Sequence, residues 1–487
     1  MKTQNNPDII GNEKNPVAVS SRRKALQKIA LLGLSATLTP YISIAEPTES
    51  YKLVIKSGKV YTGNSLQSLY VGITQDNKLK ISEKALTGTQ TIDAGGKIVS
   101  PGFIDVLADN AGNPQNTYLT FEKYKLTDGV TSVLQLHGGA ANPAAFHQQF
   151  DSRPHYTNYG VGVFVMVLRN QYADLATRYR MVEKGLVEGA LAVCHSIEYQ
   201  PTPYNEVKEY AKIAAKYNRP MFLHLRHSSE DKELEGVKEA IQLAQETGAR
   251  IHIDHLHSTG GTYHMAKALE LIQNANNFGA EITTCVYPYS YWATYLVSKR
   301  FDPGWRERYK ITYEDLTVVG TGEKLSESKF NAYRNRHGLL VAVPPGTMPF
   351  EKTVDLALQT DFCMIASDGG IESEPKANNH PRGAGCFATA IRHGLDIGMS
   401  FEKILSKVTT LPAQLMRGVM DDRGVIADGK IADLTIFDPK TINGKASVAN
   451  PNQFSEGIDW VILNGEIVYE NQKIKLSRGK SIRFAFK

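Results

Sequence analysis

Short apolar runs alternate with helix-like stretches through the middle of the chain, which predicts β-strands joined by helices. Within residues 205–217 and 230–248, apolar positions recur every three or four residues, as expected for amphipathic helices. The apolar runs give eight candidate strands: 102–106, 130–134, 161–167, 190–194, 220–223, 250–253, 281–286 and 362–366. Eight such units favour an α/β fold of the closed (β/α)8, or TIM-like, barrel type, which takes roughly 250 residues.

We expect the barrel to occupy residues 100–417, with an insertion at about residues 290–360 before its last strand. An open, doubly wound sheet is the alternative fold. Such a sheet commonly carries a glycine-rich phosphate loop after its first strand, and none follows residues 102–106. The barrel is therefore the preferred prediction.

The two ends of the chain show another pattern, in which apolar and polar residues alternate over short segments separated by Gly and Asn. Residues 51–61 follow it near the start, and residues 432–438 and 459–469 follow it near the end, where Asn464 and Gly465 form a hairpin-turn signal. We expect a small β-sandwich domain built from residues 46–99 and 418–487.

The first 45 residues have the layout of an export signal. Arg22 and Arg23 precede an apolar run at 29–44, and small residues follow around Ala45. The paired arginines resemble a twin-arginine signal and predict a periplasmic or otherwise exported protein. A membrane anchor is the alternative, but the run contains Pro40 and is shorter than the ~20 residues that a spanning helix needs. No stable membrane span is expected after removal of the signal.

Composition narrows the range of partners. The hydrophobic share of 42% and charged share of 22% are ordinary for a soluble globular protein. A net charge of +5 dispersed over 487 residues gives no basic stripe for nucleic acid. The four cysteines show no CxxC spacing and are expected to be buried free thiols. We expect a small-molecule substrate and no nucleic acid; the sequence sets no oligomeric state.

Metal-binding and acid–base side chains stand just after several candidate strands, where the active sites of such barrels lie. They include Glu198 after the fourth strand, His224 at the fifth, Asp254 and His255 at the sixth, and Asp368 at the eighth. A lone histidine is more often structural than a ligand, but several on one barrel face reverse that expectation. Imidazole and carboxylate ligands with an open fourth position suit a Zn²⁺ that activates water.

An ordered set of motifs resembles the N-acyl-D-amino-acid deacylases of the amidohydrolase superfamily over residues 51–470. The motifs are Pro101-Gly-Phe-Ile-Asp105, His224-Leu-Arg226, Asp254-His255, Tyr287-Pro-Tyr289, Ser367-Asp368-Gly369, His380-Pro-Arg382, Thr409-Thr-Leu-Pro-Ala413 and Asp428-Gly-Lys-Ile-Ala-Asp433. The resemblance implies a D-aminoacylase-like hydrolase that acts on carbon–nitrogen bonds other than peptide bonds.

The chain departs from the family pattern after its first strand. Family members carry there two histidines, one residue apart, that hold the more buried metal, whereas this chain has Leu107 and Asp109. The family's bridging cysteine near the second strand is also missing. The resemblance therefore implies one zinc, or another divalent ion, held by Glu198, His224 and His255.

The resemblance also assigns roles around the metal. Asp368 matches the acid that takes a proton from water and returns it to the leaving group. The substrate's α-carboxylate or backbone is expected at Arg382, Tyr287, Tyr199 and Ser290. Arg226, just after the fifth strand, adds positive potential near the barrel mouth and is a further candidate for binding a carboxylate-bearing substrate. Auxiliary candidates for metal binding or proton transfer, with packing as the alternative, are His137, Asp109 and His257.

Three functions stay open on the sequence. The first is a metal-dependent amidohydrolase that cleaves an N-acyl (D-)amino acid or a related amide with metal-activated water and an Asp acid–base. The second is a lyase, isomerase or decarboxylase on the same scaffold, because the first metal motif is lost. The third, motivated by Leu107, is a catalytically inactive binding protein.

Overall fold

The structure is a computed structural model that describes residues 50–108, 114–371 and 379–485. Eight parallel strands form the central sheet in the order β18-β14-β13-β12-β11-β10-β9-β8. Their bounds are β8 Phe103–Asp105, β9 Val130–Ala140, β10 Asn158–Phe164, β11 Val193–Ser196, β12 Met221–His224, β13 Ile251–Ile253, β14 Ile282–Val286 and β18 Cys363–Ile365. A parallel bridge between Ala108 and Gly369 joins the first strand to the last. The structure thus confirms the (β/α)8 barrel.

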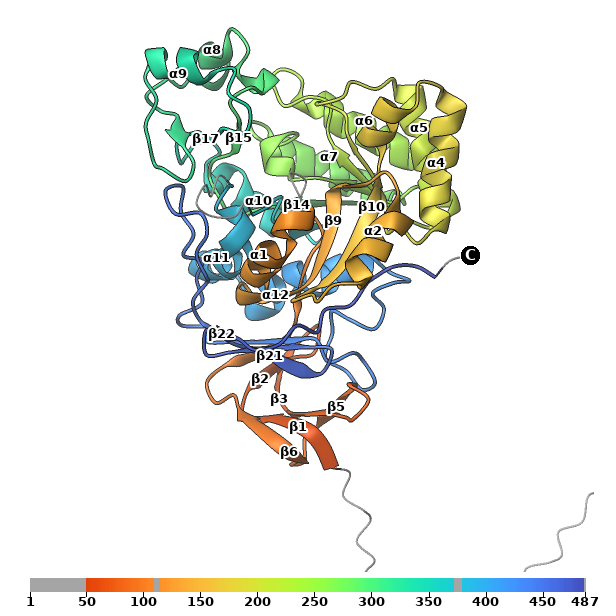
Figure 1. Cartoon of the computed structure of the whole chain (residues 1–487), viewed down its shortest axis with the longest axis vertical. Coiled ribbons are helices and arrows are strands. Elements are labelled where there is room, and N and C mark those ends of the chain that lie inside the picture. Colours follow the sequence, from red (N-terminus) through yellow and green to blue (C-terminus); the bar gives the residue numbers. More distant parts are fainter. Residues whose placement is uncertain (1–49, 109–113, 372–378, 486–487) are drawn as a thin grey trace, which may run out of the picture. The chain divides into compact units, whose positions relative to one another are not determined.

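Helices follow the strands and cover the outside of the sheet (Figure 1). They are α1 Pro114–Thr127, α2 Pro143–Asp151, α3 Val165–Gln171, α4 Leu175–Val187, α5 Tyr204–Lys216, α6 Glu233–Thr247, α7 Met265–Asn277, α10 Val354–Leu358, α11 Arg382–Asp396, α12 Phe401–Val408 and α13 Thr410–Leu415. α6 illustrates the local signals: it has two acidic residues in its first turn and ends at Gly248, whose φ of 67° suits glycine.

Several predicted strand bounds differ from the structure. β9 continues well beyond residue 134, to Ala140, and β11 begins at Val193 rather than at residue 190. Residues 161–167 form a single apolar run, but β10 ends at Phe164 and α3 begins at Val165. Hydrophobic content alone cannot separate the two elements, because the strand and the start of the helix are both buried.

A segment between β14 and β18 forms its own small substructure, drawn in green in Figure 1. It contains a three-stranded antiparallel sheet in the order β15-β17-β16, with bounds Ala293–Tyr295, Leu340–Ala342 and Thr317–Val318. Two short helices, α8 (Trp305–Tyr309) and α9 (Glu327–Tyr333), pack through stacked rings of Trp305 and Phe330. These rings belong to the same buried hydrophobic cluster as the barrel residues, so the insertion packs onto the barrel core.

Strands from both chain ends form two further sheets, which lie together in Figure 1. The four-stranded sheet runs β5-β4-β1-β6, with bounds Leu79–Ser82, Tyr70–Ile73, Ser50–Lys56 and Thr87–Asp93. The seven-stranded sheet runs β22-β21-β20-β19-β7-β2-β3, with bounds Lys473–Ile474, Glu466–Glu470, Ile458–Leu463, Leu434–Phe437, Ile98–Pro101, Lys59–Tyr61 and Leu66–Ser68. Because β7 pairs with β19 and leads directly into β8, this sheet is attached to the first strand of the barrel.

Candidate active site

A cavity of about 1350 Å³ opens at the carboxyl ends of the barrel strands. Residues from the ends of β9, β11, β12 and β18 line it, together with the inserted segment from Trp292 to Arg308. The cavity thus lies where (β/α)8 barrels carry their active sites, and the insertion supplies part of its wall.

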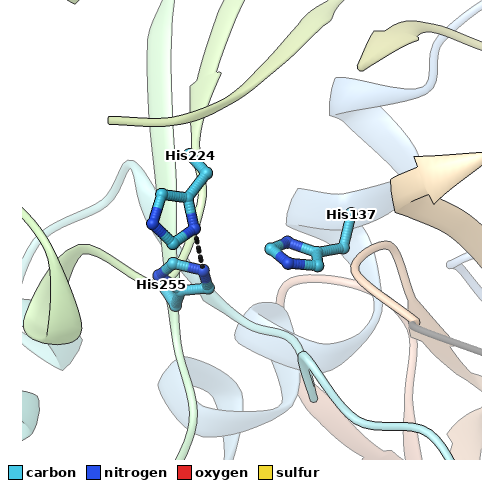
Figure 2. Close-up of side chains that lie close together, drawn as sticks. All are labelled: His137, His224 and His255. Atoms are coloured by element: carbon cyan, nitrogen blue, oxygen red, sulfur yellow. Dashed lines mark hydrogen bonds between the residues drawn. The ribbon is translucent and has the colours of Figure 1, made fainter. Parts of the chain in front are cut away.

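Three histidines converge in this cavity (Figure 2). His224 ends β12, His255 follows β13, and His137 lies in the last part of β9. One ring nitrogen from each lies within 4.8 Å of those of the other two, and His224 Nδ1 is 3.1 Å from His255 Nε2. Two nitrogens bound at about 2.1 Å in a tetrahedral zinc site stand roughly 3.4 Å apart, so the cluster has the spacing of a metal site.

In each of these three imidazoles, one ring nitrogen lies close to the oxygen of a neighbouring carboxylate or hydroxyl group. His224 Nε2 donates to Glu198 Oε2 at 2.8 Å, and His255 Nδ1 shares a hydrogen bond of 2.9 Å with Ser258 Oγ. His137 Nδ1 lies 3.4 Å from Asp254 Oδ2. Carboxylate and hydroxyl partners of this kind fix the ring orientation of metal-binding histidines.

Burial favours the uncharged imidazoles that metal binding requires. Desolvation lowers the pKa of His224 and lowers that of His255 well below its usual value. It also raises the pKa of Asp254 to about 6. Both histidines thus stay neutral to a lower pH than an exposed imidazole would.

His137 reaches the cluster through an irregular stretch of strand. Two glycines follow it, and Gly139 has a φ of 119°. A side chain at Gly139 would place its Cβ 2.4 Å from the carbonyl oxygen of Gly162 on β10. The pairing of β9 with β10 also changes register here. Glycine therefore allows the close approach that turns this end of β9 and presents His137.

Asp368 lies beside the histidine cluster. Its Oδ1 is 3.5 Å from His137 Nε2, and its Oδ2 is 3.8 Å from His255 Nε2. Arg382 Nη2, from the start of α11, forms a 2.8 Å ion pair with Asp368 Oδ2. The guanidinium of Arg382 also packs over the ring of Tyr287, 4.5 Å from its centroid. Asp368 has a φ of 48°, a strained backbone conformation of the kind that clusters at functional sites.

Glu198 does not join the cluster, which differs from the sequence-based prediction. It accepts hydrogen bonds from His224 and from Ser228, and it lies 3.4 Å from Arg300 Nη2. Burial raises the pKa of Glu198, but Arg300, His224 and Ser228 together bring it well below its usual value. The structure therefore gives Glu198 the position of an ionised partner behind His224.

Arg300 was not anticipated from the sequence. It belongs to the insertion, is 8% exposed, and its guanidinium lies 5.0 Å from the ring centroid of Trp292. Its Nε has no hydrogen-bond partner among the described residues. No motif surrounds Arg300 in the sequence; the only available signal was its place in an insertion beside the barrel mouth.

The predicted substrate-binding residues fall into two groups. Tyr199 and Tyr287 line the cavity, and the ring of Tyr199 lies 4.6 Å from that of His224. Arg226 also lines it, but a double ion pair with Glu239 on α6 already engages its guanidinium. Ser290 accepts backbone hydrogen bonds from residues 346 and 348 and so closes the base of the insertion. Arg226 and Ser290 thus stabilise the surrounding structure.

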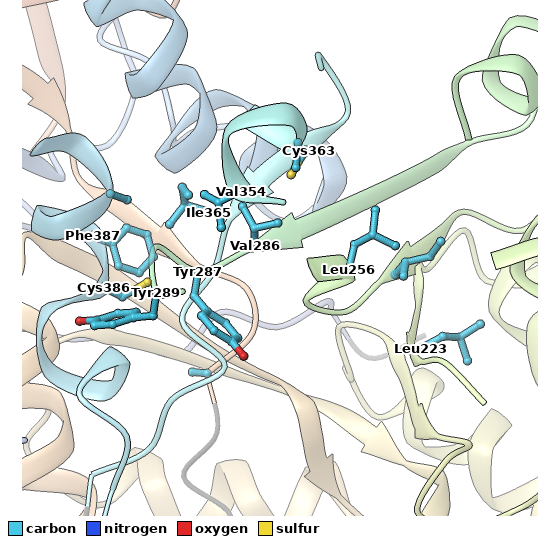
Figure 3. Close-up of a cluster of buried hydrophobic side chains, with 14 of the residues drawn as sticks. Leu223, Leu256, Val286, Tyr287, Tyr289, Val354, Cys363, Ile365, Cys386 and Phe387 are labelled. Carbon is cyan, nitrogen blue, oxygen red and sulfur yellow. The ribbon is translucent and has the colours of Figure 1, made fainter. Parts of the chain in front are cut away.

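Of the two remaining auxiliary residues, the structure describes His257, which is not one of the three clustered histidines. His257 is fully buried with its ring 4.1 Å from that of Tyr287, and neither of its ring nitrogens has a hydrogen-bond partner among the described residues. Asp109 lies outside the described residues. Figure 3 shows Tyr287 and Tyr289 beside Phe387 and Cys386, and all four residues belong to the buried hydrophobic core.

The sequence from residue 98 to residue 468 matches the model of the amidohydrolase family. The chain therefore belongs to the amidohydrolase family, and it is a hydrolase of carbon–nitrogen bonds other than peptide bonds.

Particular members of the family are similar along nearly their whole length. The N-acyl-D-glutamate deacylase of Alcaligenes xylosoxydans xylosoxydans is 25% identical, covering 89% of this chain and 97% of the relative. The D-aminoacylase of the same organism is 22% identical, covering 87% and 96%. The crystal structure of N-acyl-D-glutamate deacylase from Bordetella bronchiseptica, complexed with zinc and a phosphonate inhibitor, superposes with a TM-score of 0.76 at 23% identity, covering 90% of this chain and 100% of that one.

Among the described residues, no helix combines the length and apolar character needed to cross a membrane.

Proposed function

We propose that this chain is an exported, mononuclear metal-dependent deacylase of N-acyl-D-amino acids. The observation that carries the proposal is the convergence of His137, His224 and His255 next to Asp368 and Arg382, at the carboxyl ends of the barrel strands. The site thus offers a metal-binding set, a carboxylate for proton transfer and a guanidinium for substrate in one cavity.

The three imidazoles fit one divalent ion. Three nitrogen ligands with room for a fourth are the donor set of catalytic zinc sites. Two of the rings are held neutral by burial, and each ring has an anchoring partner, as metal-binding histidines commonly have. Leu107 offers no lone pair at the end of the first strand, which favours one ion over two. A divalent ion held here supplies a Lewis acid and lowers the pKa of a water molecule.

Asp368 has the position of the acid–base group. Its carboxylate takes a proton from the attacking water as oxygen bonds to the acyl carbon. It then gives this proton to the amide nitrogen as the carbon–nitrogen bond breaks. The products are a carboxylic acid and a free amino acid, so one water is consumed and no other reactant is needed.

Two arginines favour a substrate with negative charge. Arg382 has the planar donor geometry that suits a carboxylate, and it would exchange part of its contact with Asp368 for the substrate's α-carboxylate. Arg300 lines the same cavity, so its guanidinium would add positive charge facing a second acceptor group of the substrate. The similarity to deacylases of N-acyl-D-glutamate and N-acyl-D-aspartate supports acidic D-amino acids.

The test combines metal content with product analysis. Signal-free protein is loaded with zinc, its metal is counted by plasma mass spectrometry, and it is assayed on matched N-acetyl-D- and N-acetyl-L-amino acids. We expect one ion per chain and release of the free D-amino acid, fastest for N-acetyl-D-glutamate or N-acetyl-D-aspartate. Release of no amino acid from any N-acyl amino acid, by zinc-loaded protein, would contradict the proposal.

Arg300 provides a sharper test of substrate charge. Arg300→Met should reduce kcat/KM for N-acetyl-D-glutamate by at least about tenfold, because a buried charge-assisted contact is lost. The value for N-acetyl-D-norvaline, which has no side-chain carboxylate, should change much less. An equal loss of kcat/KM on both substrates would show that Arg300 does not recognise the side-chain carboxylate and only holds Glu198 in place.

Export rests on the sequence, since residues 1–49 lie outside the described residues. Arg22 and Arg23 motivate the twin-arginine route. Cell fractionation of the full chain should find the processed protein outside the cytoplasm, and replacing both arginines by lysine should hold it inside. Unchanged export in that variant would rule out the twin-arginine route.

A further inference from the structure

A fully buried ionic network joins the first and last strands of the barrel next to Asp368, which lines the cavity. Lys125 on α1 and Asp105 at the end of β8 are both 0% exposed, and Lys125 Nζ lies 2.9 Å from Asp105 Oδ2. Lys125 Nζ also donates to Ser367 Oγ at 2.7 Å. Ser367 is fully buried and immediately precedes Asp368.

The side-chain oxygen atoms of this network are each engaged in two or more hydrogen bonds. Asp105 Oδ2 accepts from Lys125 and, at 2.6 Å, from the Ser367 hydroxyl. Asp105 Oδ1 accepts from the backbone N–H groups of Ser367 at 3.0 Å and Leu107 at 3.3 Å. The Ser367 hydroxyl in turn accepts from the backbone N–H of Gly369 at 3.1 Å. Three partners thus hold the residue before Asp368, and one holds the residue after it.

This arrangement accounts for the backbone of Asp368. A non-glycine residue at a φ of 48° is strained, and such strain persists only where the surroundings fix it. Ser367 and Gly369 are fixed on either side, so the chain between them has little freedom. The Asp368 carboxylate is consequently directed toward His137, His255 and Arg382.

We infer that Lys125 is a positioning residue for the reaction: through Asp105 and Ser367 it fixes Asp368 in the orientation that proton transfer requires. The inference rests on the proposed acid–base role of Asp368. Lys125 does not line the cavity and acts only through the seam between β8 and β18.

The test compares two buried lysines. Lys125→Met removes the ammonium from the seam. Lys407→Met is the matched control: Lys407 is 1% exposed, lies on α12, and bonds the carbonyl of Thr360 before the start of β18, away from the cavity. Metal content, Tm, kcat and KM on the best N-acyl amino acid are measured for both.

We expect Lys125→Met to retain one metal ion and to keep KM within about threefold, while kcat falls between about tenfold and a hundredfold, as for a catalytic group misplaced by about 1 Å. Lys407→Met should lower Tm yet keep kcat within about twofold. Wild-type kcat in Lys125→Met, or loss of its metal, would overturn the inference.

A double mutant separates positioning from general damage. If Lys125 acts through Asp368, Lys125→Met should slow the Asp368→Asn enzyme by no more than about twofold. If Lys125→Met lowers kcat in the Asp368→Asn enzyme by the same factor as in the wild type, the inference is overturned.

A second variant serves if Lys125→Met fails to fold. Ser367→Ala keeps the ion pair but removes the link to Gly369. Its kcat should fall about fivefold, and an unchanged kcat would overturn the inference. Retained activity in Asp368→Asn alone would instead refute the proposed function.

Discussion

The two sides of the cavity floor are built in different ways. On one side, β9, β12 and β13 present His137, His224 and His255, and each ring is oriented mainly by one side-chain partner. On the other side, β8 and β18 present Leu107 and Asp368, and the backbone itself is clamped by buried charge. On the metal side, side-chain contacts set the orientation of each ring. On the acid–base side, hydrogen bonds to the main chain set the position of Asp368.

This difference follows from what each side must do. A bound ion gathers its ligands by direct coordination, so the imidazoles need only approximate placement beforehand. A proton-transfer group receives no such help and has to be placed by the protein. We therefore expect changes on the metal side to alter metal affinity, and changes on the seam to alter rate at full metal occupancy.

The largest effect should come from removing one imidazole. His137→Ala, His224→Ala and His255→Ala should each lose the metal and nearly all activity, because two ligands do not hold a catalytic ion firmly. Plasma mass spectrometry after dialysis measures the occupancy. His195→Asn serves as the control, since His195 is buried near the same strand ends but bonds Thr202 outside the cluster. Full occupancy in His137→Ala would remove His137 from the ligand set.

Asp368→Asn should leave occupancy near one ion and reduce kcat by at least about a hundredfold, because acid–base help of this kind is worth about 10²–10⁴ in rate. Occupancy and steady-state kinetics on the same preparation measure both. If the Asp368→Asn enzyme stays active, another group must carry the acid–base role.

The anchoring carboxylates should have intermediate effects. Asp254→Asn and Glu198→Gln should weaken metal binding about ten- to a hundredfold, as losses of outer hydrogen-bond partners do. Competition with a chelator of known affinity gives the dissociation constants. Glu198→Gln distinguishes two assignments. If Glu198 is a direct ligand, as the sequence predicted, Glu198→Gln should lose as much metal affinity as His224→Ala.

The smallest effect concerns pH. Two exposed imidazoles with a pKa of 6.5 would each be about tenfold less available at pH 5.5 than at pH 7.5, giving about a hundredfold loss of affinity. Burial lowers the pKa of His224 and His255, so both stay neutral to lower pH, and protons compete less with the metal. We expect a clearly smaller loss, measured as dissociation constants at the two pH values. A hundredfold loss or more would show that the rings titrate as exposed groups.

Much of the molecule could be predicted from hydrophobic pattern. Apart from the end of β9, the barrel strands were placed to within a few residues, because parallel strands buried on both faces leave continuous apolar runs. His224, His255 and Asp368 were expected at one site because the carboxyl ends of parallel strands meet at one edge of the barrel, and all three line the cavity. The boundary between β10 and α3 was missed, since one apolar run passes through both elements.

The sequence by itself thus determined the barrel, the end of the barrel that carries the site, and the kinds of side chain gathered there. Only the tertiary structure decided that His137 joins the cluster, because a glycine-dependent irregularity in β9 aims its ring. It also decided that Glu198 stands behind His224 and that Arg300, 102 positions away along the chain, reaches Glu198. Periodicity encodes which face of an element is buried, whereas ligand sets depend on side-chain directions and on distances of a few ångströms between segments remote in sequence.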